Sequence, residues 1–310
     1  MYFYLSIIIC THNPRQDYLA RVLEALKKQS LSLDKWELLL IDNASDKLLA
    51  SEIDLSWHPH ARHIREDEIG LTPARLRGIE EAKGKILVFV DDDNLLLPNY
   101  LDEALNILTK MSWLGAIGGQ IIPEYEVSPP EWLLPYERVL AIRRVDKQRW
   151  SNSIDDWQSQ PWGAGLVVYK EVCDRYLQNL LHNPNRRNLD RKGDLLISGG
   201  DTDIVLTSLE LGMGFGVFPE LEVIHLIPER RMTEKYILQL FRGLSTSRLL
   251  LPYLRGEPLP PRRERQSFYA ELRRFYHFLK TPRIVRRIEE SAIAGEGDFE
   301  RIISDLEVGL

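Results

Sequence analysis

Residues 86–93 read Ile-Leu-Val-Phe-Val-Asp-Asp-Asp, five apolar residues followed directly by three carboxylates. A continuous apolar run of this length, rich in β-branched residues, predicts a strand buried on both faces of a sheet. Three adjacent carboxylates at the end of such a strand repel one another unless a positive charge lies among them. A hard divalent cation is the natural partner. The alternative is a solvated acidic turn that caps the following helix.

Two more apolar runs precede this stretch, and each also ends in polar residues. Residues 5–10 are followed by Thr11-His12-Asn13, and residues 36–41 by Asp42-Asn43. Apolar strands separated by helices predict an α/β fold with a Rossmann-like, mostly parallel central sheet flanked by helices. Ligands bind such sheets beyond the carboxyl ends of the strands, where these polar residues would lie. Segments with apolar residues at helical spacing are 18–28, 72–83 and 98–111.

The composition restricts the class of protein. The 310 residues carry 40 Lys and Arg against 46 Asp and Glu, a net charge of −6. Because nucleic-acid binding needs a basic footprint, we expect no nucleic acid among the partners. Cys10 and Cys173 match no zinc spacing and fit a reducing compartment. No apolar run reaches the roughly 18 residues that span a bilayer, so we expect a cytoplasmic location.

Five short motifs in a fixed order carry a resemblance to a known family. The chain resembles a family 2 glycosyltransferase of the GT-A fold over about residues 4–226. Each motif alone is weak, and the order of the five makes the signal specific. They are Ser6-Ile7-Ile8-Ile9-Cys10-Thr11-His12-Asn13, Ile41-Asp42-Asn43-Ala44-Ser45, Gly70-Leu71-Thr72-Pro73-Ala74-Arg75, Asp91-Asp92-Asp93 and Gly200-Asp201-Thr202-Asp203.

The resemblance implies an inverting, metal-assisted enzyme that moves a sugar from a nucleotide-diphosphate sugar, by default a UDP-sugar. It implies a hydroxyl acceptor on a saccharide or a lipid-linked molecule, in a setting such as surface polysaccharide assembly. Its donor-binding residues would be Thr11 and Asn13 beside the nucleoside, Asp42 on the uracil or ribose, Arg75 on the base or pyrophosphate, and Asp91 and Asp92 near the ribose or sugar. Asp93 would hold Mn²⁺ or Mg²⁺, and such a cation stabilises the departing diphosphate as a Lewis acid.

An inverting transfer also needs a base that takes the proton of the acceptor hydroxyl. Asp201 matches the second acid of the family's Glu-Asp pair and is the candidate, with Asp203 as the alternative. Gly200 stands where the family usually has glutamate, which is a departure from the pattern. Asp201 also suits a helix cap, a role compatible with catalysis.

Three further features fit the same site. Trp162-Gly163 lies between the two acidic motifs, where glycine permits close backbone approach and tryptophan offers a stacking face for the acceptor. His225 follows an apolar run and is a candidate metal ligand, as in some GT-A enzymes. Arg230 and Arg231 come next and suit a diphosphate, because guanidinium groups bind phosphate oxygens bidentately. Packing in the core or simple solvation are the alternatives for each.

Two other functions remain as alternatives. A sugar-phosphate nucleotidyltransferase would carry a Gly- and Arg-rich loop after the first strand, whereas residues 11–15 contain no glycine. A catalytically inactive GT-A module that only binds nucleotide-sugars would not need Asp91, Asp93 and Asp201 together.

The chain is predicted to divide into a catalytic domain, 1–230, and a helical basic region, 231–310. Within the first, residues 123–160 are rich in Pro, Trp and charge and predict an irregular insertion that selects the acceptor. Within the second, residues 262–287 interleave arginines with aromatics. That pattern fits the charged surface of a helix, a peripheral contact at the inner face of a membrane, or a partner interface. The sequence does not indicate an oligomeric state.

Overall fold

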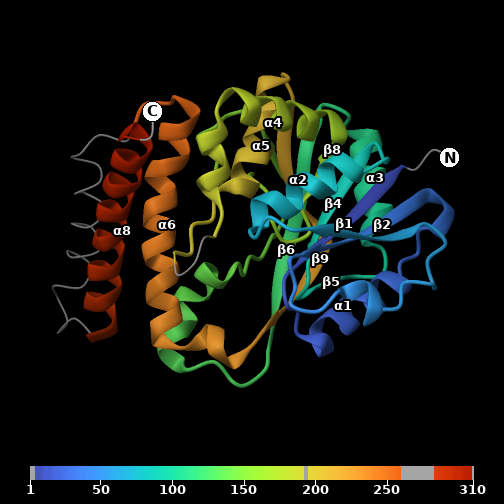
Figure 1. Ribbon diagram of the computed structural model, residues 1–310, viewed down its shortest axis with the longest axis horizontal. Coiled ribbons are helices and arrows are strands. Elements are labelled where there is room, and N and C mark those ends of the chain that lie inside the picture. The colour runs from blue at the N-terminus through green and yellow to red at the C-terminus, as the bar shows by residue number, and fades with distance from the viewer. Residues whose placement is uncertain (1–3, 192–194, 260–282, 309–310) are drawn as a thin grey trace.

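A computed structural model describes residues 4–191, 195–259 and 283–308. Its centre is a nine-stranded sheet in the order β3-β2-β1-β4-β8-β6-β9-β5, with β7 pairing on β9 (Figure 1). The first four strands of that order are parallel, as the sequence predicts. They are β1 (Leu5–Thr11), β2 (Trp36–Asn43), β3 (Ala61–Glu66) and β4 (Ile86–Asp91).

The other half of the sheet mixes strand directions. β8 joins the halves and runs antiparallel to both β4 and β6, while β6 and β9 are parallel to each other. β5 and β7 are short antiparallel partners of β9. The bounds are β5 (Asn94–Leu96), β6 (Leu114–Tyr125), β7 (Arg149–Ser151), β8 (Val167–Tyr169) and β9 (Gly214–Ile227).

Helices cover both faces of the sheet because successive strand residues point to opposite sides. Ile7 and Ile9 of β1 pack in the core cluster that holds the apolar residues of α1 and α3. Ile8, between them, packs in the cluster of α2, α4 and α5. The bounds are α1 (Gln16–Lys27), α2 (Leu71–Glu81), α3 (Tyr100–Lys110), α4 (Lys170–His182) and α5 (Gly200–Glu210).

The C-terminal part is helical, as predicted. α6 (Glu234–Arg255) and α8 (Arg283–Val308) lie side by side at the edge of the molecule (Figure 1). Arg242 on α6 binds Asp298 on α8, with Nη2 2.7 Å from Oδ1. No helix within the described ranges is both long and apolar enough to cross a membrane. Most of the Arg-rich stretch, residues 262–282, lies outside the described residues.

The predicted boundary at residue 230 falls in a short 3₁₀ helix, η5 (Glu229–Met232). Beyond it, α6 shares an apolar cluster with another 3₁₀ segment, η3 (Glu131–Leu140), through Leu133, Leu140 and Leu240. Gly243 of α6 also lies so close to the Leu196 backbone that a Cβ would overlap its carbonyl carbon at 2.3 Å. α6 therefore packs directly on segments that precede residue 230. The remaining 3₁₀ helices are η1 (Leu33–Lys35), η2 (Leu49–Ser51) and η4 (Pro184–Leu189).

Candidate functional site

A cleft of about 530 Å³ opens at the carboxyl ends of β1 and β4. The end of β4 contributes its carboxylates, the start of α5 forms one wall, and η3 and α6 form another. Parallel strands bring their carboxyl ends to one edge, which is why segments far apart in sequence meet here. Nine of the residues predicted from the sequence line the cleft: Arg75, Asp91, Asp92, Asp93, Trp162, Gly163, Asp201, His225 and Arg231.

The three carboxylates after β4 differ in their surroundings. Burial raises the pKa of Asp91, and the charge of Asp93 raises it further. Burial and Asp93 also raise the pKa of Asp92 to about 6, although the Thr11 hydroxyl donates a hydrogen bond to it. Asp93 is the exception, because Arg231 and His225 outweigh its burial and hold its pKa below the usual range. The cluster is a site of concentrated negative charge in need of a cation.

Arg231 supplies one such cation in the structure. Its Nη1 lies 2.8 Å from Asp93 Oδ2 and 3.0 Å from His225 Nε2. His225 Nε2 is 3.6 Å from the same Asp93 oxygen, and its buried Nδ1 has no partner within the described part of the chain. The sequence pointed to this arginine only as one of an Arg230-Arg231 pair.

The donor set fits a divalent cation only in part. Asp93 and His225 offer a carboxylate oxygen and an imidazole nitrogen, ligands that suit Mn²⁺. The Arg231 guanidinium takes the position between them, so a metal ion there requires that this side chain move. No three His, Cys, Asp or Glu side chains converge on a shared metal position in the ranges that the structure describes.

Asp201 occupies the first turn of α5 and is held by backbone amides. Its Oδ2 accepts the Gly163 N–H at 2.7 Å, and its Oδ1 accepts the Thr202 N–H at 2.8 Å. A Cβ on Gly163 would lie 2.8 Å from Asp201 Oδ2, so a larger residue would push the carboxylate away. Gly163 thus positions the acid, whereas the sequence suggested only contact with the acceptor.

Arg75 lies buried among carboxylates from three segments. Burial alone would lower its pKa, but Asp190, Asp201 and Asp91 raise it, so the guanidinium stays charged. Arg75 Nη1 is 3.4 Å from Asp190 Oδ1, and Thr72 on the same helix donates its hydroxyl to Asp190 Oδ2 at 2.7 Å. Helix α2 therefore carries a fixed positive charge into the cleft.

Asp190 and Arg191 also line the cleft, and sequence reasoning missed both. They follow η4, in a stretch with no motif and no regular periodicity. One signal was present in the sequence: Gly200 breaks the family pattern. A Cβ on Gly200 would meet the carboxyl carbon of Asp190 at 2.7 Å. Asp190 therefore fills the space that a side chain at position 200 would take, and places a carboxylate there from another segment.

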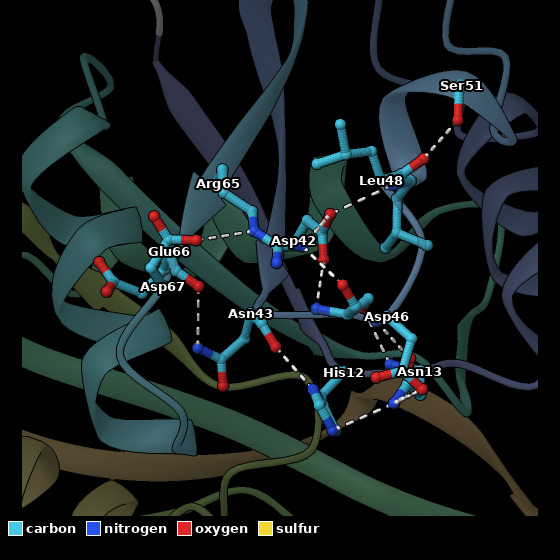
Figure 2. Close-up of polar contacts among 12 residues, drawn as sticks. His12, Asn13, Asp42, Asn43, Asp46, Leu48, Ser51, Arg65, Glu66 and Asp67 are labelled. Atoms are coloured by element: carbon cyan, nitrogen blue, oxygen red, sulfur yellow. Dashed lines mark hydrogen bonds and ion pairs between the residues drawn. The ribbon is translucent and has the colours of Figure 1, made fainter.

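Asp42 is the penultimate residue of the neighbouring strand β2, where it contacts the loop that follows (Figure 2), and it is not among the residues that line the cleft. Ser45 N–H donates to its Oδ1 at 3.1 Å, and Leu49 N–H and Arg65 Nη1 donate to its Oδ2 at 3.1 and 2.9 Å. Burial would raise the pKa of Asp42, but these bonds hold it below its usual value. The carboxylate therefore organises the loop after β2.

Asn13 joins the same loop rather than lining the cleft (Figure 2). It has a left-handed φ of 47°, and its Oδ1 accepts the Asp46 N–H at 2.9 Å. Its own N–H donates to Ser45 Oγ at 2.9 Å. Thr11, two residues earlier, is buried, and its hydroxyl bond to Asp92 links it to the site.

Asp203, the alternative base, is fully buried and lies outside the cleft lining. Arg186 donates two hydrogen bonds to it, at 2.9 and 2.6 Å, and Arg255 donates a third at 2.8 Å. A base must reach the hydroxyl that it deprotonates, whereas this carboxylate is enclosed and bound by arginines. The period of the helix explains the difference, because residues two apart on α5 point in different directions.

Comparison with known proteins identifies relatives in sequence and in fold. Residues 6–158 match the model of glycosyl transferase family 2. Glycosyltransferase AglE of Haloferax volcanii is 26% identical over 121 residues, 38% of this chain and 39% of that protein. N-acetylgalactosaminyltransferase 7 of Drosophila melanogaster is 28% identical over 182 residues, 53% of this chain and 31% of that protein.

The fold is shared with a solved structure, TarS of S. aureus, at a TM-score of 0.52 and 14% identity. The match covers 98% of this chain and 49% of TarS. This chain spans less than half the length of each of these three proteins. The structural likeness concerns the fold alone, and with the family match it confirms the predicted GT-A architecture. Residues 6–158, just under half of the chain, are thus a glycosyl transferase family 2 region.

Proposed function

We propose that this chain is an inverting glycosyltransferase that moves a sugar from a nucleotide-diphosphate sugar, by default a UDP-sugar, to a hydroxyl of a saccharide or lipid-linked acceptor. The observation that carries the proposal is one cleft holding both parts of the chemistry. Arginines surround the Asp91–Asp93 cluster at one side, and Asp201 stands fixed by the Gly163 N–H at the other.

The donor side must accept two phosphates beside three carboxylates. Arg75, Arg191 and Arg231 line this part of the cleft, and guanidinium groups bind phosphate oxygens with directed hydrogen bonds. Arg231 is already poised on Asp93, so it can turn between that carboxylate and a phosphate. A divalent cation held by Asp93 and His225 would add Lewis-acid stabilisation of the departing diphosphate.

The acceptor side supplies the base. The acceptor oxygen attacks the anomeric carbon from the face opposite the diphosphate, so the configuration inverts as the new glycosidic bond forms. The bond between that carbon and the phosphate oxygen breaks, and its electron pair leaves with the diphosphate. Asp201 accepts the hydroxyl proton, and the Gly163 N–H keeps the carboxylate oriented during the transfer.

A donor screen tests the proposal. Thermal unfolding with Mn²⁺ and a panel of nucleotide-sugars identifies the donor, and release of nucleoside diphosphate measures turnover. We expect Asp201→Asn to bind the donor as tightly as the wild type and to lose transfer by about 10²–10⁴-fold, the usual contribution of a general base. Asp305→Asn, the same change at an exposed position on α8, is the control.

Two results would favour the other functions. Release of pyrophosphate from a nucleoside triphosphate and a sugar 1-phosphate would identify a nucleotidyltransferase. Tight donor binding by the wild type, with neither hydrolysis nor transfer to any acceptor tried, would identify a binding module.

A further inference from the structure

A second pocket, of about 280 Å³, adjoins the cleft. The two share Arg138 and Trp162 as lining residues, so a ligand extending from the cleft would enter the pocket directly. The pocket is built largely from the irregular 123–160 insertion. Its charged lining residues are the four arginines Arg138, Arg143, Arg144 and Arg149 and the two acids Glu137 and Asp146.

The positive charge in this pocket is not balanced by its own acids. Asp146 binds Arg149 at 3.0 Å, and Glu137 accepts the Tyr125 hydroxyl at 3.1 Å. Arg138 and Arg143 form no ion pair with any carboxylate among the described residues. Proteins rarely leave a half-buried arginine such as Arg143 without a counter-ion, because the charge loses hydration.

The positive charges of neighbouring arginines repel the Arg143 guanidinium. Burial, together with the charges of Arg138 and Arg149, lowers its pKa to about 10, although the charge of Asp156 offsets part of this effect. Its guanidinium donates to backbone carbonyls, including Gln160 O at 2.5 Å, which hold it in place without neutralising it. An anion entering the pocket would relieve this repulsion.

Two tryptophans make the pocket suited to a sugar. Arg138 lies over the Trp157 ring at 4.5 Å and the Trp162 ring at 5.4 Å, and Arg143 lies over Trp162 at 5.0 Å. The Trp157 side chain is 52% exposed although it belongs to this cluster. Flat apolar faces stack on sugar rings, while the guanidinium groups beside them match planar or tetrahedral oxyanions.

We propose that this pocket binds an acidic sugar residue of the acceptor, held by its carboxylate or phosphate oxygens on Arg138 and Arg143 and by its ring on the tryptophans. This inference rests on the proposed function, since it assigns the acceptor of the same site. Trp162 precedes Gly163, whose N–H orients Asp201. The acidic residue therefore sits next to the sugar whose hydroxyl Asp201 deprotonates.

Calorimetric titration of the full chain tests whether the pocket binds the carboxylate of an acidic sugar. The probes are a hyaluronan tetrasaccharide, which carries uronic acids, and chitotetraose, a neutral oligosaccharide of equal length. We expect hyaluronan to bind at least about 10-fold more tightly, and Arg138→Gln to weaken it about 10-fold, because charge-assisted hydrogen bonds are lost. Arg138 is exposed, so the variant should fold normally. Arg175→Gln, an exposed arginine on α4, is the matched control.

The same titration with glucose 6-phosphate and with glucose tests whether the pocket binds a phosphate group. Preference for either anionic probe that Arg138→Gln removes and Arg175→Gln preserves supports the proposal and identifies the anion. Equal binding of charged and neutral probes, or a preference that Arg138→Gln leaves intact, overturns it. Because these titrations contain no donor, their failure leaves the turnover measured with nucleotide-sugars untouched, so the two proposals fail separately.

Discussion

Two groups of aspartates lie within residues 1–230 and behave in opposite ways. Asp42 and Asp203 have carboxylates saturated by amide or guanidinium donors. Asp91 and Asp92 face other carboxylates, and their pKa values are raised by burial and by Asp93. Asp42 and Asp203 stabilise the fold. Asp91 and Asp92 are repelled by Asp93, and a bound cation or a positively charged ligand group would reduce that repulsion. The partners of each carboxylate, together with its remaining exposure at the cleft, decide which aspartate is available for chemistry.

The largest expected effect is on the free energy of unfolding, which should respond differently to substitutions in the two groups. Asp203→Asn should lower the free energy of unfolding by about 3–5 kcal/mol, because Arg186 and Arg255 would keep buried charges without a counter-ion. Asp91→Asn should leave stability unchanged or raise it, since it removes a charge that repels Asp93. Urea denaturation of both variants measures this. Equal losses in the two variants would contradict the distinction.

Asp190 lies between the groups, because it lines the cleft and is also paired with Arg75. Gly200→Ala should displace its carboxylate and cost about 1–3 kcal/mol of stability by overpacking. Transfer activity should fall as well, because Arg75 loses its fixed partner. Gly297→Ala offers the control, because a Cβ at this glycine of α8 would meet no atom within 4 Å. Full activity and stability in Gly200→Ala would show that Asp190 has room to move.

Substitution of Asp93 tests whether the Asp91–Asp93 cluster binds a divalent cation. Asp93→Ala should weaken donor binding in Mn²⁺ about 10-fold, equivalent to about 1.4 kcal/mol, and should make the affinity insensitive to EDTA. Calorimetry with the donor identified by the screen, with and without EDTA, measures both. If the wild type binds the donor equally well in EDTA, Arg231 alone serves as the counter-charge at this position.

The smallest expected effect concerns pH. Because the folded-state pKa of Asp42 lies below its usual 3.8, its carboxylate adds stability above that value, and the gain disappears as the pH falls through the folded pKa. Asp42→Asn should therefore cost about 1 kcal/mol at neutral pH, and the difference from the wild type should shrink below about pH 4. Denaturation curves at pH 7 and pH 3 give the comparison. A difference that grows in acid would contradict the assignment.

Much of the architecture was predictable from local pattern. The apolar runs at 5–10, 36–41 and 86–90 became parallel strands, because continuous burial on two faces leaves a clear signal. The position of Asp91–Asp93 at the edge of the sheet followed from the same runs. The antiparallel β8 was not predicted, since a strand of three residues carries no direction in its sequence.

The residues of the candidate site also fall into those that local motifs predicted and those that they did not. Asp91, Asp93 and Asp201 were found because they lie in short motifs at the ends of recognisable elements. Asp190, Arg191 and the Arg138–Arg143 pocket come from irregular segments, where no period predicts which way a side chain points.

The sequence by itself determined the strand and helix order, the family, and the acidic motifs at the strand ends, because these depend on contacts near in the chain and on spacing. Only the tertiary structure decided which acids are free, that Asp190 fills the space beside Gly200, and that Arg231 lies on Asp93. Those outcomes depend on partners 10 to 138 residues away in the chain, and no local pattern encodes such pairings.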